Sequence, residues 1–381
     1  MAGMRVGVMD MIVAGRPSAD TFTRASYLGA AAGRVDSFWV PDHLNALFPR
    51  SLWRPEYCAW AKYLPSADAC LEPWTMLGRV SARNRVARLK LGVGVTDTGR
   101  RNPAVTAQAA ATLHLLSRGR AILGIGPGER EGNEPYGVEW SKPVARFEEG
   151  LATIRALWDS NGEPVTRESA YFPLRNAMFA LPPYRGTRPQ LWIGAHGPRM
   201  LRAAGRYGDA YFPAFPQTPT EYAAGLDAVR AAASDAGRDP MSVLPAKWIG
   251  VVTGRSTAEV DEALDSEILK AGTLTASDEF FAAHDAQHPL GVGFAGAQDL
   301  LPQEWDEQTA LSYAKGVTPA VMHDMGLVGT VGEALEQAAE WRDRGVRYLV
   351  LTNFSLMQRS LRNGLAATGP FYRIVRGVKK L

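Results

Sequence analysis

The hydrophobic pattern of this chain alternates between short apolar runs and longer stretches with helical periodicity. Apolar runs that end in glycine or polar residues are typical of buried parallel strands, and the stretches between them predict helices. The expected strands are 4–9, 36–40, 89–95, 120–125, 191–195, 209–212, 245–253 and 347–352. The expected helices are 19–33, 72–83, 103–118, 143–158, 198–207, 219–236, 257–270 and 331–345, with a last helical segment near 358–379.

This alternation predicts an α/β fold, a (β/α)8 TIM barrel with its site at the carboxyl ends of the strands. The length of 381 residues suits one domain that spans 1–381. The stretches 41–71, 160–190 and 273–306 exceed ordinary loop length, and we expect them to be insertions at the carboxyl face of the barrel. Their aromatic and proline content predicts an apolar trough over the barrel mouth.

The charge balance excludes a nucleic-acid-binding footprint, because 42 Lys and Arg offset 39 Asp and Glu to leave a net charge of +3. Two cysteines, Cys58 and Cys70, are too few for a disulfide scaffold. Neither a signal peptide nor an apolar run long enough to span a membrane is recognisable. We therefore expect a cytoplasmic protein.

The basic C-terminal end is more typical of a solvated helix face than of a membrane anchor. Its basic residues are Arg373, Arg376, Lys379 and Lys380. Its apolar residues are Phe371, Ile374, Val375 and Val378. These apolar residues leave an interfacial helix, and with it peripheral membrane contact, open. A homodimer is also left open.

The segment 88–134 contains two strands that each end in a glycine-rich polar loop. The alanine-rich stretch between them predicts a βαβ unit, which places both strand ends on one side of the sheet. After the second strand, Gly124, Gly126 and Gly128 allow close approach of a flat or phosphorylated ligand, or build a tight turn. The acidic residues Glu129 and Glu131 follow at once. The spacing G-I-G-P-G-E differs from the dinucleotide fingerprint G-x-G-x-x-G, which argues against a NAD site.

Asp42 and His43 follow the second expected strand, where barrel side chains reach the mouth. A histidine with an ordinary pKa near 6.5, beside a carboxylate, can transfer protons near neutral pH. The alternative is structural: a helix cap or loop hydrogen bond for Asp42, and a histidine with satisfied hydrogen bonds beside it.

Four motifs then occur in strand order: D-H after the second strand, G-V-G-V-T after the third with N-P-A-V-T-A-Q-A opening the next helix, G-I-G-P-G-E after the fourth, and W-I-G-A-H-G-P-R after the fifth. Together they resemble the luciferase-like superfamily, and within it the branch that uses coenzyme F420, a deazaflavin. The segments R-R-N-P-A-V-T-A-Q-A-A-A-T-L-H-L-L and E-R-E-G-N-E-P-Y-G-V-E-W, with the C-terminal R-G-V-K-K-L, are similar to mycobacterial ketoreductases of phthiodiolone and phenolphthiodiolone dimycocerosates. The resemblance covers almost the whole chain.

The resemblance implies a role for each matching residue near the first three strands. Asp42 matches a deazaflavin contact, and His43 is the leading proton donor. Gly94 and Val95, followed by Thr96, match a bulge whose non-prolyl cis peptide backs the deazaflavin ring.

Further along the chain, Gly126, Pro127 and Gly128 match the loop that lies along the cofactor, and Glu129 matches an active-site acid. Asn133 matches a family asparagine, although one extra residue intervenes here.

After the fifth strand, the resemblance implies a phosphate cradle of Gly194, Ala195, His196 and Gly197 leading into a helix N-terminus. Two departures separate this chain from the sugar-phosphate dehydrogenases of the superfamily. His196 stands where they have glycine, and Leu47 stands where they have an active-site tryptophan. Their substrate is therefore not carried over.

The activity implied by the resemblance is that of an F420-dependent ketoreductase in cell-envelope lipid metabolism, in which hydride from the reduced deazaflavin converts a lipid ketone to a secondary alcohol. The incipient alkoxide needs a proton, from His43 or from Glu129 with a pKa raised by a desolvated pocket. His43 is favoured because its proton is available near pH 7 without a large pKa shift. The alternatives are an FMN-dependent luciferase-like monooxygenase and a catalytically silent flavin-binding barrel.

Two weaker patterns are also present in the sequence. His284 and His288 are four residues apart, as metal ligands on one helix face would be, but no third ligand pairs with them and we expect no metal site. The first long stretch contains four aromatic residues, which either pack the core or line an acyl-chain entrance: Trp53, Tyr57, Trp60 and Tyr63.

Overall fold

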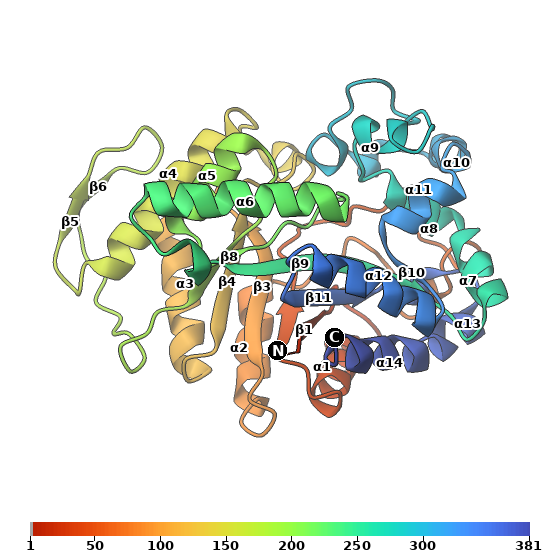
Figure 1. Ribbon diagram of the computed structural model, residues 1–381, viewed down its shortest axis with the longest axis horizontal. Coiled ribbons are helices and arrows are strands. Elements are labelled where there is room, and N and C mark those ends of the chain that lie inside the picture. Colours follow the sequence, from red (N-terminus) through yellow and green to blue (C-terminus); the bar gives the residue numbers. More distant parts are fainter. Residues whose placement is uncertain (1–2) are drawn as a thin grey trace.

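Eight parallel strands form a closed barrel in the computed structural model, which describes residues 3–381 (Figure 1). The barrel strands are β1 (Arg5–Met9), β2 (Ser37–Val40), β3 (Lys90–Asp97), β4 (Ala121–Gly126), β7 (Gln190–Ile193), β8 (Ala210–Tyr211), β9 (Leu244–Thr253) and β11 (Tyr348–Asn353). Neighbours pair in chain order, and the pairing of β11 with β1 closes the ring. The predicted (β/α)8 barrel is confirmed, and each expected strand is present.

Helices cover the outside of the barrel: α1 (Thr21–Ala32), α2 (Pro73–Arg83), α3 (Pro103–Leu116), α4 (Pro143–Asp159), α5 (Pro198–Tyr207), α6 (Pro219–Asp235), α12 (Val331–Asp343) and α14 (Thr368–Val378). Local sequence explains where several begin. Glu72 and Asn102 cap α2 and α3 by accepting hydrogen bonds from backbone N–H groups of the first turn, and Thr218 with Glu221 forms a capping box on α6.

Two expected helices are each divided in the structure. The stretch 257–270 forms α7 (Thr257–Leu264) and α8 (Glu267–Thr273), because Ser266 has an extended backbone and its hydroxyl accepts a hydrogen bond from the N–H of Arg359. The stretch 358–379 forms α13 (Leu361–Ala366) and α14, where Pro370 has no N–H to donate to the preceding turn.

Several elements were not expected from the sequence. The stretch 160–190 contains a hairpin of β5 (Val165–Arg167) and β6 (Leu174–Ala177), and 273–306 contains α9 (Asp278–Ala282). Then come α10 (Glu307–Lys315), α11 (Pro319–Asp324) and β10 (Gly326–Gly329). The strand β10 pairs with the carboxyl half of β9, beyond the end of the short β8. The 3-10 turns are η1 (Arg50–Leu52), η2 (Ala59–Lys62), η3 (Glu134–Tyr136), η4 (Pro240–Ser242), η5 (Gly296–Gln298), η6 (Pro302–Glu304) and η7 (Phe354–Met357).

Large aromatic side chains fill the barrel interior. Trp39, Trp192, Phe212 and Tyr348 are essentially unexposed and contact one another through their rings. Space for Trp39 comes from glycine on the adjacent strand β3, because a Cβ on Gly92 would lie 2.3 Å from the indole ring. The interior is therefore solid below the carboxyl ends of the strands, and a ligand can bind only above it.

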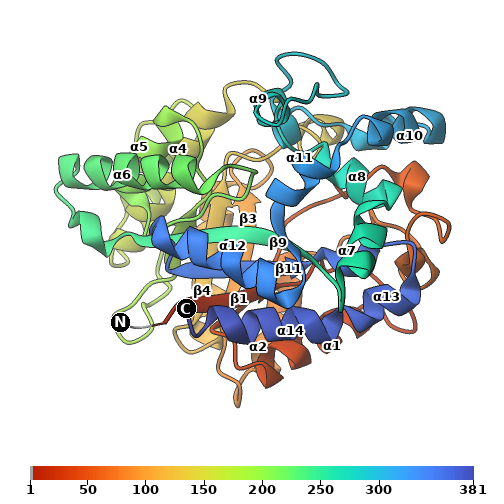
Figure 2. The same cartoon turned by 45° about the vertical axis from the view of Figure 1, so that its right-hand side comes forward.

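A second apolar cluster lies above the barrel mouth. It is built by α7 to α11 together with the first long stretch, and Figure 2 shows these helices gathered at the upper right. Its members include Leu52, Phe281 and Val321, which come from three separate parts of the chain. This cluster roofs one side of the mouth.

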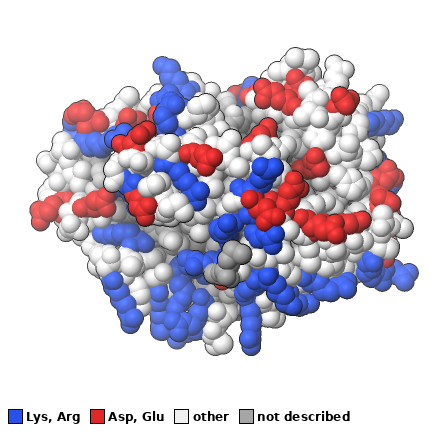
Figure 3. Space-filling model, viewed as in Figure 1, with Lys and Arg blue, Asp and Glu red and all other residues white. Residues whose placement is uncertain are grey.

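The basic side chains are unevenly distributed. On the face shown in Figure 3, Lys and Arg gather along the lower edge, below α2 and α14. The apolar residues of α14, Phe371, Ile374, Val375 and Val378, are buried in the main core. An interfacial helix formed by these four residues is therefore wrong, while peripheral membrane contact and a homodimer stay predictions. No helix within residues 3–381 has the length and apolar character to cross a membrane.

Candidate active site

An apolar chamber of about 590 Å³ lies over the carboxyl ends of the strands. Its floor includes Met9, Gly94, Val95 and Phe212, and its walls include segments of the first long stretch and of α8 and α11. Of the site residues predicted from the sequence, His43, Glu129, Gly94 and Val95 line this chamber. The two predicted proton donors therefore lie beside the predicted backing of the ring.

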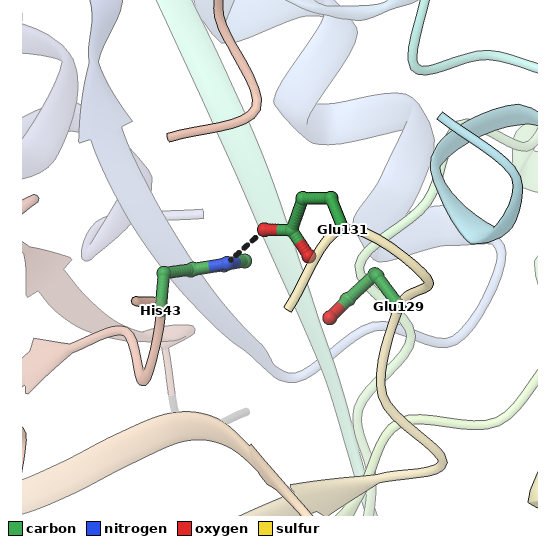
Figure 4. A group of neighbouring side chains, drawn as sticks. All are labelled: His43, Glu129 and Glu131. Carbon is green, nitrogen blue, oxygen red and sulfur yellow. Dashed lines mark hydrogen bonds and ion pairs between the residues drawn. The ribbon is translucent and has the colours of Figure 1, made fainter. Parts of the chain in front are cut away.

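His43, Glu129 and Glu131 form the polar cluster of this chamber. Figure 4 shows both carboxylates reaching from the loop after β4 toward the histidine. His43 Nδ1 lies 3.0 Å from Oε1 of Glu131, and one ligand-type atom from each of the three residues lies within 4.8 Å of the others. The side chain of His43 is 19% exposed and that of Glu131 is fully buried. The ring of His43 therefore faces the chamber, and the buried Glu131 fixes its orientation through the hydrogen bond at Nδ1.

The pKa values of this cluster follow from burial and mutual charge. Burial alone would lower the pKa of His43, but the hydrogen bond and charge of Glu131, with the charge of Glu129, raise it from 6.5 to about 9. Burial raises the pKa of Glu129 from 4.5 to about 7, against the opposing charge of His43. The expectation that His43 needs no large pKa shift is wrong. Its proton is nevertheless available at pH 7, because Glu131 stabilises the imidazolium.

Replacing Glu131 by glutamine should lower the pKa of His43 from about 9 toward or below 6.5, because burial then acts without the compensating charge. The raised pKa also means that His43 stabilises the wild-type fold fully below pH 6.5 and loses this contribution as the pH rises through about 9. NMR titration of the imidazole, with urea unfolding across this pH range, measures both effects.

The matched control is Glu134→Gln, since Glu134 is exposed in the same loop and pairs with Arg130 instead. It should leave the titration of His43 unchanged. An unaltered His43 titration in Glu131→Gln would show that the pair does not set the charge of the ring.

Asp42 does not act with His43 as a pair facing the chamber. Its carboxylate accepts hydrogen bonds from Thr96 Oγ1 at 2.6 Å and Arg101 Nε at 2.8 Å, and Arg100 lies 3.4 Å away. These partners lower the pKa of Asp42 against the effect of burial. The structural alternative for Asp42, a loop hydrogen bond, is therefore realised, and its predicted contact with a deazaflavin stays a prediction, as does that of Thr96.

The bulge expected after the third strand is present. The Gly94–Val95 peptide bond is cis, and the pairing of β3 with β4 shifts between Val93 and Thr96. The side chain of Val95 packs beside the α-carbons of Gly124 and Gly126, where added Cβ atoms would lie 3.3 and 3.2 Å from its methyl groups. Gly126 therefore leaves room for the side chain of Val95, while Gly124 chiefly leaves room for the carbonyl oxygen of Val93, 2.3 Å from its added Cβ.

The loop after β4 is held from within the protein. Asn133 is fully buried and donates to the carbonyl of Glu129 at 2.9 Å and to Asp97 at 3.3 Å. A Cβ on Gly128, whose φ is +89°, would lie 2.9 Å from both Asn133 and Asp97. Neither Asn133 nor Gly128 lines the chamber, nor does Pro127 between the strand end and Glu129. The contacts observed for Asn133 position Glu129, and cofactor contact by these residues stays a prediction.

The predicted phosphate cradle lies where β7 meets α5. Gly197 precedes the first residue of α5, no side chain caps this helix, and a Cβ on Gly197 would meet nothing within 4 Å. His196 stacks on Phe215, and burial lowers its pKa to about 3. Gly194 and Ala195 continue the strand end, and Gly194 donates its N–H to Ile125. The uncapped N–H groups of α5 suit an anion, while the neutral His196 adds no charge.

The long stretches contribute unequally to the chamber. Residues of 41–71 and 273–306 line it, as expected, but none of 160–190 does. The trough expected from 160–190 is wrong, because its hairpin lies on the outer flank beyond α4 (Figure 1). Trp53 and Trp60 line the chamber, whereas Tyr57 hydrogen-bonds Glu307 and Tyr63 is 40% exposed.

The two histidines at metal-ligand spacing do not converge. Both follow the end of α9; His284 hydrogen-bonds Asp324, and His288 packs between Phe281 and Phe294. Two residues of the site have no role predicted from the sequence: Glu131, which enters there only as an acidic residue of the loop, and Arg100. The signal for Glu131 was its place two residues after Glu129, on a loop already identified.

A closed parallel barrel with its proton-carrying side chains at the carboxyl ends of the strands is the architecture of a TIM-barrel enzyme site. The sequence matches the model of a family described as luciferase-like monooxygenase over residues 4–348, and the chain belongs to this family.

Two relatives of this chain are named phthiodiolone/phenolphthiodiolone dimycocerosates ketoreductase. That of Mycobacterium sp. (strain JLS) is 67% identical over 381 residues, and that of Mycobacterium bovis (strain BCG / Pasteur 1173P2) is 57% identical over 382 residues. Both matches cover 100% of each chain. A solved F420-dependent secondary alcohol dehydrogenase in complex with an F420-acetone adduct superimposes with a TM-score of 0.72 over 98% of this chain and 99% of that chain. At 19% identity this last likeness shows the fold.

Proposed function

We propose that this protein is a coenzyme F420-dependent ketoreductase that reduces the ketone of a phthiodiolone-type lipid to a secondary alcohol. Full-length relatives at 67% and 57% identity carry the name of that activity. The observation in the structure that carries the proposal is the placement of His43 and Glu129 on the wall of an apolar chamber, next to the Gly94–Val95 bulge. An apolar chamber with one acidic corner suits a long-chain ketone that needs a single proton.

The residues around the bulge fit a deazaflavin. The ring would lie against Gly94 and Val95, with the loop 126–128, Asp42 after β2 and Thr96 on β3 as the further predicted contacts. Its phosphate would lie at 194–197, where α5 begins without a side-chain cap and Gly197 leaves open space. The reduced cofactor supplies a hydride and reacts poorly with oxygen.

The chain's own residues supply orientation and the proton. His43, charged at neutral pH through Glu131, would hold its Nε2–H toward the ketone oxygen and give up this proton as the carbonyl carbon gains a hydride. Such a step would balance as one secondary alcohol, one neutral imidazole and the oxidised deazaflavin. Glu129, with a pKa of about 7 and a carboxylate oxygen within 4.8 Å of a ring nitrogen of His43, is a second proton carrier at this corner. The apolar walls exclude water, which strengthens the attraction between His43 and a developing alkoxide.

Titration with each oxidised cofactor tests the proposal directly. We expect coenzyme F420 to bind more tightly than flavin mononucleotide, and calorimetry measures both affinities. Gly197→Glu should weaken F420 binding roughly tenfold or more, because a carboxylate at the start of α5 repels the phosphate.

Gly332→Glu is the matched control for this titration. It places the same charge near the start of α12, where an added Cβ also meets open space, and should leave F420 binding unchanged. Tighter binding of flavin mononucleotide would instead favour the luciferase-like monooxygenase.

A further inference from the structure

The chamber extends beyond the barrel mouth into an arm between the first and last helices of the chain. Four residues on one stripe of α1 line it: Phe22, Ala25, Ser26 and Gly29. Four residues of α13 and α14 face them: Leu365, Thr368, Phe371 and Tyr372. The first set has the spacing of one helix face, and the second runs from α13 into α14, so α1 on one side and α13 with α14 on the other enclose the arm. Figures 1 and 2 both show α1 beside α14.

Small side chains on α1 create the space of this arm. A Cβ on Gly29 would lie 2.1 Å from the hydroxyl of Tyr372, so glycine is needed for the two helices to approach here. Further toward the start of α1, Ala25 leaves the arm open. Ala25 is exposed and Leu365 is 50% exposed, although both line the chamber. The arm therefore opens to solvent on the flank of the barrel.

The lining of the arm is mainly hydrocarbon. Asp10, at the end of β1, is its charged residue, and its carboxylate accepts hydrogen bonds from the N–H of Ile12 and the hydroxyl of Thr23. Because these groups belong to the protein, the carboxylate needs no partner from a ligand. The ring of Phe22 and the side chain of Leu365 remain to contact whatever occupies the arm.

We propose that this arm is a binding site for one saturated alkyl chain of the ketone substrate, which leads the chain from the ketone site to the surface between α1 and α13. The inference rests on the proposed function and adds the route of a chain. Continuity with the corner that holds His43 argues for a part of the substrate rather than a separate ligand. The region between α8 and α11 is the other apolar part of the chamber, and its residues Leu269, Thr273 and Met322 are buried, so it offers a wall and no comparable opening.

Selectivity between two ketones tests the arm. Laurone has two long alkyl chains, and diethyl ketone has none that would reach the arm. In Ala25→Phe, the ratio of kcat/KM for laurone to that for diethyl ketone should fall roughly 10- to 50-fold, because the new ring displaces buried methylenes. Ala32→Phe makes the same change at an exposed position of α1 outside the chamber and should keep the wild-type ratio. An unchanged ratio in Ala25→Phe overturns the proposal, whether or not both activities fall.

Photolabelling gives a readout that needs no hydride transfer. The probe is a dialkyl ketone with a diazirine near the end of one long chain, and labelled residues are mapped by peptide mass spectrometry. We expect labels on α1 and on α13 or α14, and fewer there in Ala25→Phe. Labels confined to α8 and α11 would overturn the proposal that the arm binds an alkyl chain. If the wild type reduces neither ketone, the proposed function fails, while the labelled positions still decide whether the arm holds a chain.

Discussion

His43→Ala should lower the rate of ketone reduction in a single turnover by roughly 10²- to 10⁴-fold, the usual contribution of a positioned general acid. The structure places this ring on the chamber wall with its Nδ1 bound to Glu131, which leaves the other nitrogen for the ketone. Mixing the protein, loaded with reduced F420, with a lipid ketone and following the return of deazaflavin absorbance measures this step apart from substrate delivery.

His323→Ala is a suitable control, because His323 is exposed on α11 and lies outside the chamber. F420 affinity should stay nearly intact in His43→Ala. The carboxylate of Glu129 and the ring of His43 lie at the same corner of the chamber, so either could donate the proton. Comparing the rate in Glu129→Gln with that in His43→Ala distinguishes the two candidate donors. A large loss in Glu129→Gln together with a wild-type rate in His43→Ala would assign the proton to Glu129 and leave His43 an orienting residue.

Arg100→Met should lower the free energy of unfolding at pH 7 by about 3–5 kcal/mol, the usual cost of removing one partner from a buried ion pair. The side chain of Arg100 is 11% exposed and lies 3.2 Å from Asp97 and 3.4 Å from Asp42, which are 4% and 3% exposed. Burial already raises the pKa of Asp97 despite Arg100. Without Arg100 the pKa of Asp97 rises further. The loss in free energy of unfolding caused by Arg100→Met should therefore become smaller as the pH falls and Asp97 takes up a proton.

Urea unfolding at pH 7 and pH 5 measures the deficit and its pH dependence. Arg175→Met is the matched control, since Arg175 and its partner Glu168 are 68% and 79% exposed. It should change the unfolding free energy by less than about 0.5 kcal/mol. A loss below about 1 kcal/mol in Arg100→Met would mean that the two aspartates are stable without this guanidinium.

The barrel could be predicted because its strands are buried on both faces and therefore read as continuous apolar runs. The short β10 gave no such signal, because two of its four residues are glycine. The helices α10 and α11 were missed although Asp306 and Thr318 cap them, since the stretch lies between expected units and has no strand of its own. Elements inserted between the regular strand–helix units do not follow the repeating pattern of the barrel, so the pattern does not predict them.

The candidate site could be predicted as far as its residues follow strand ends. His43, Glu129 and the bulge at Gly94–Val95 were found in this way, and the structure brings them to one chamber. The pairing of His43 with Glu131 joins residues 88 positions apart and depends on how two loops meet above the barrel. The raised pKa of His43 depends on this same meeting of loops. Neither the pairing nor the pKa could be predicted, because no local sequence pattern encodes how loops pack against each other.

One wall of the chamber is built by the two ends of the sequence together. The strand β1 closes the barrel by pairing with β11, and the arm needs α1 together with α13 and α14. Segments more than 300 residues apart in the sequence must therefore meet before the chamber has its complete wall. Any cut that removes α14 therefore removes one wall of the chamber with it.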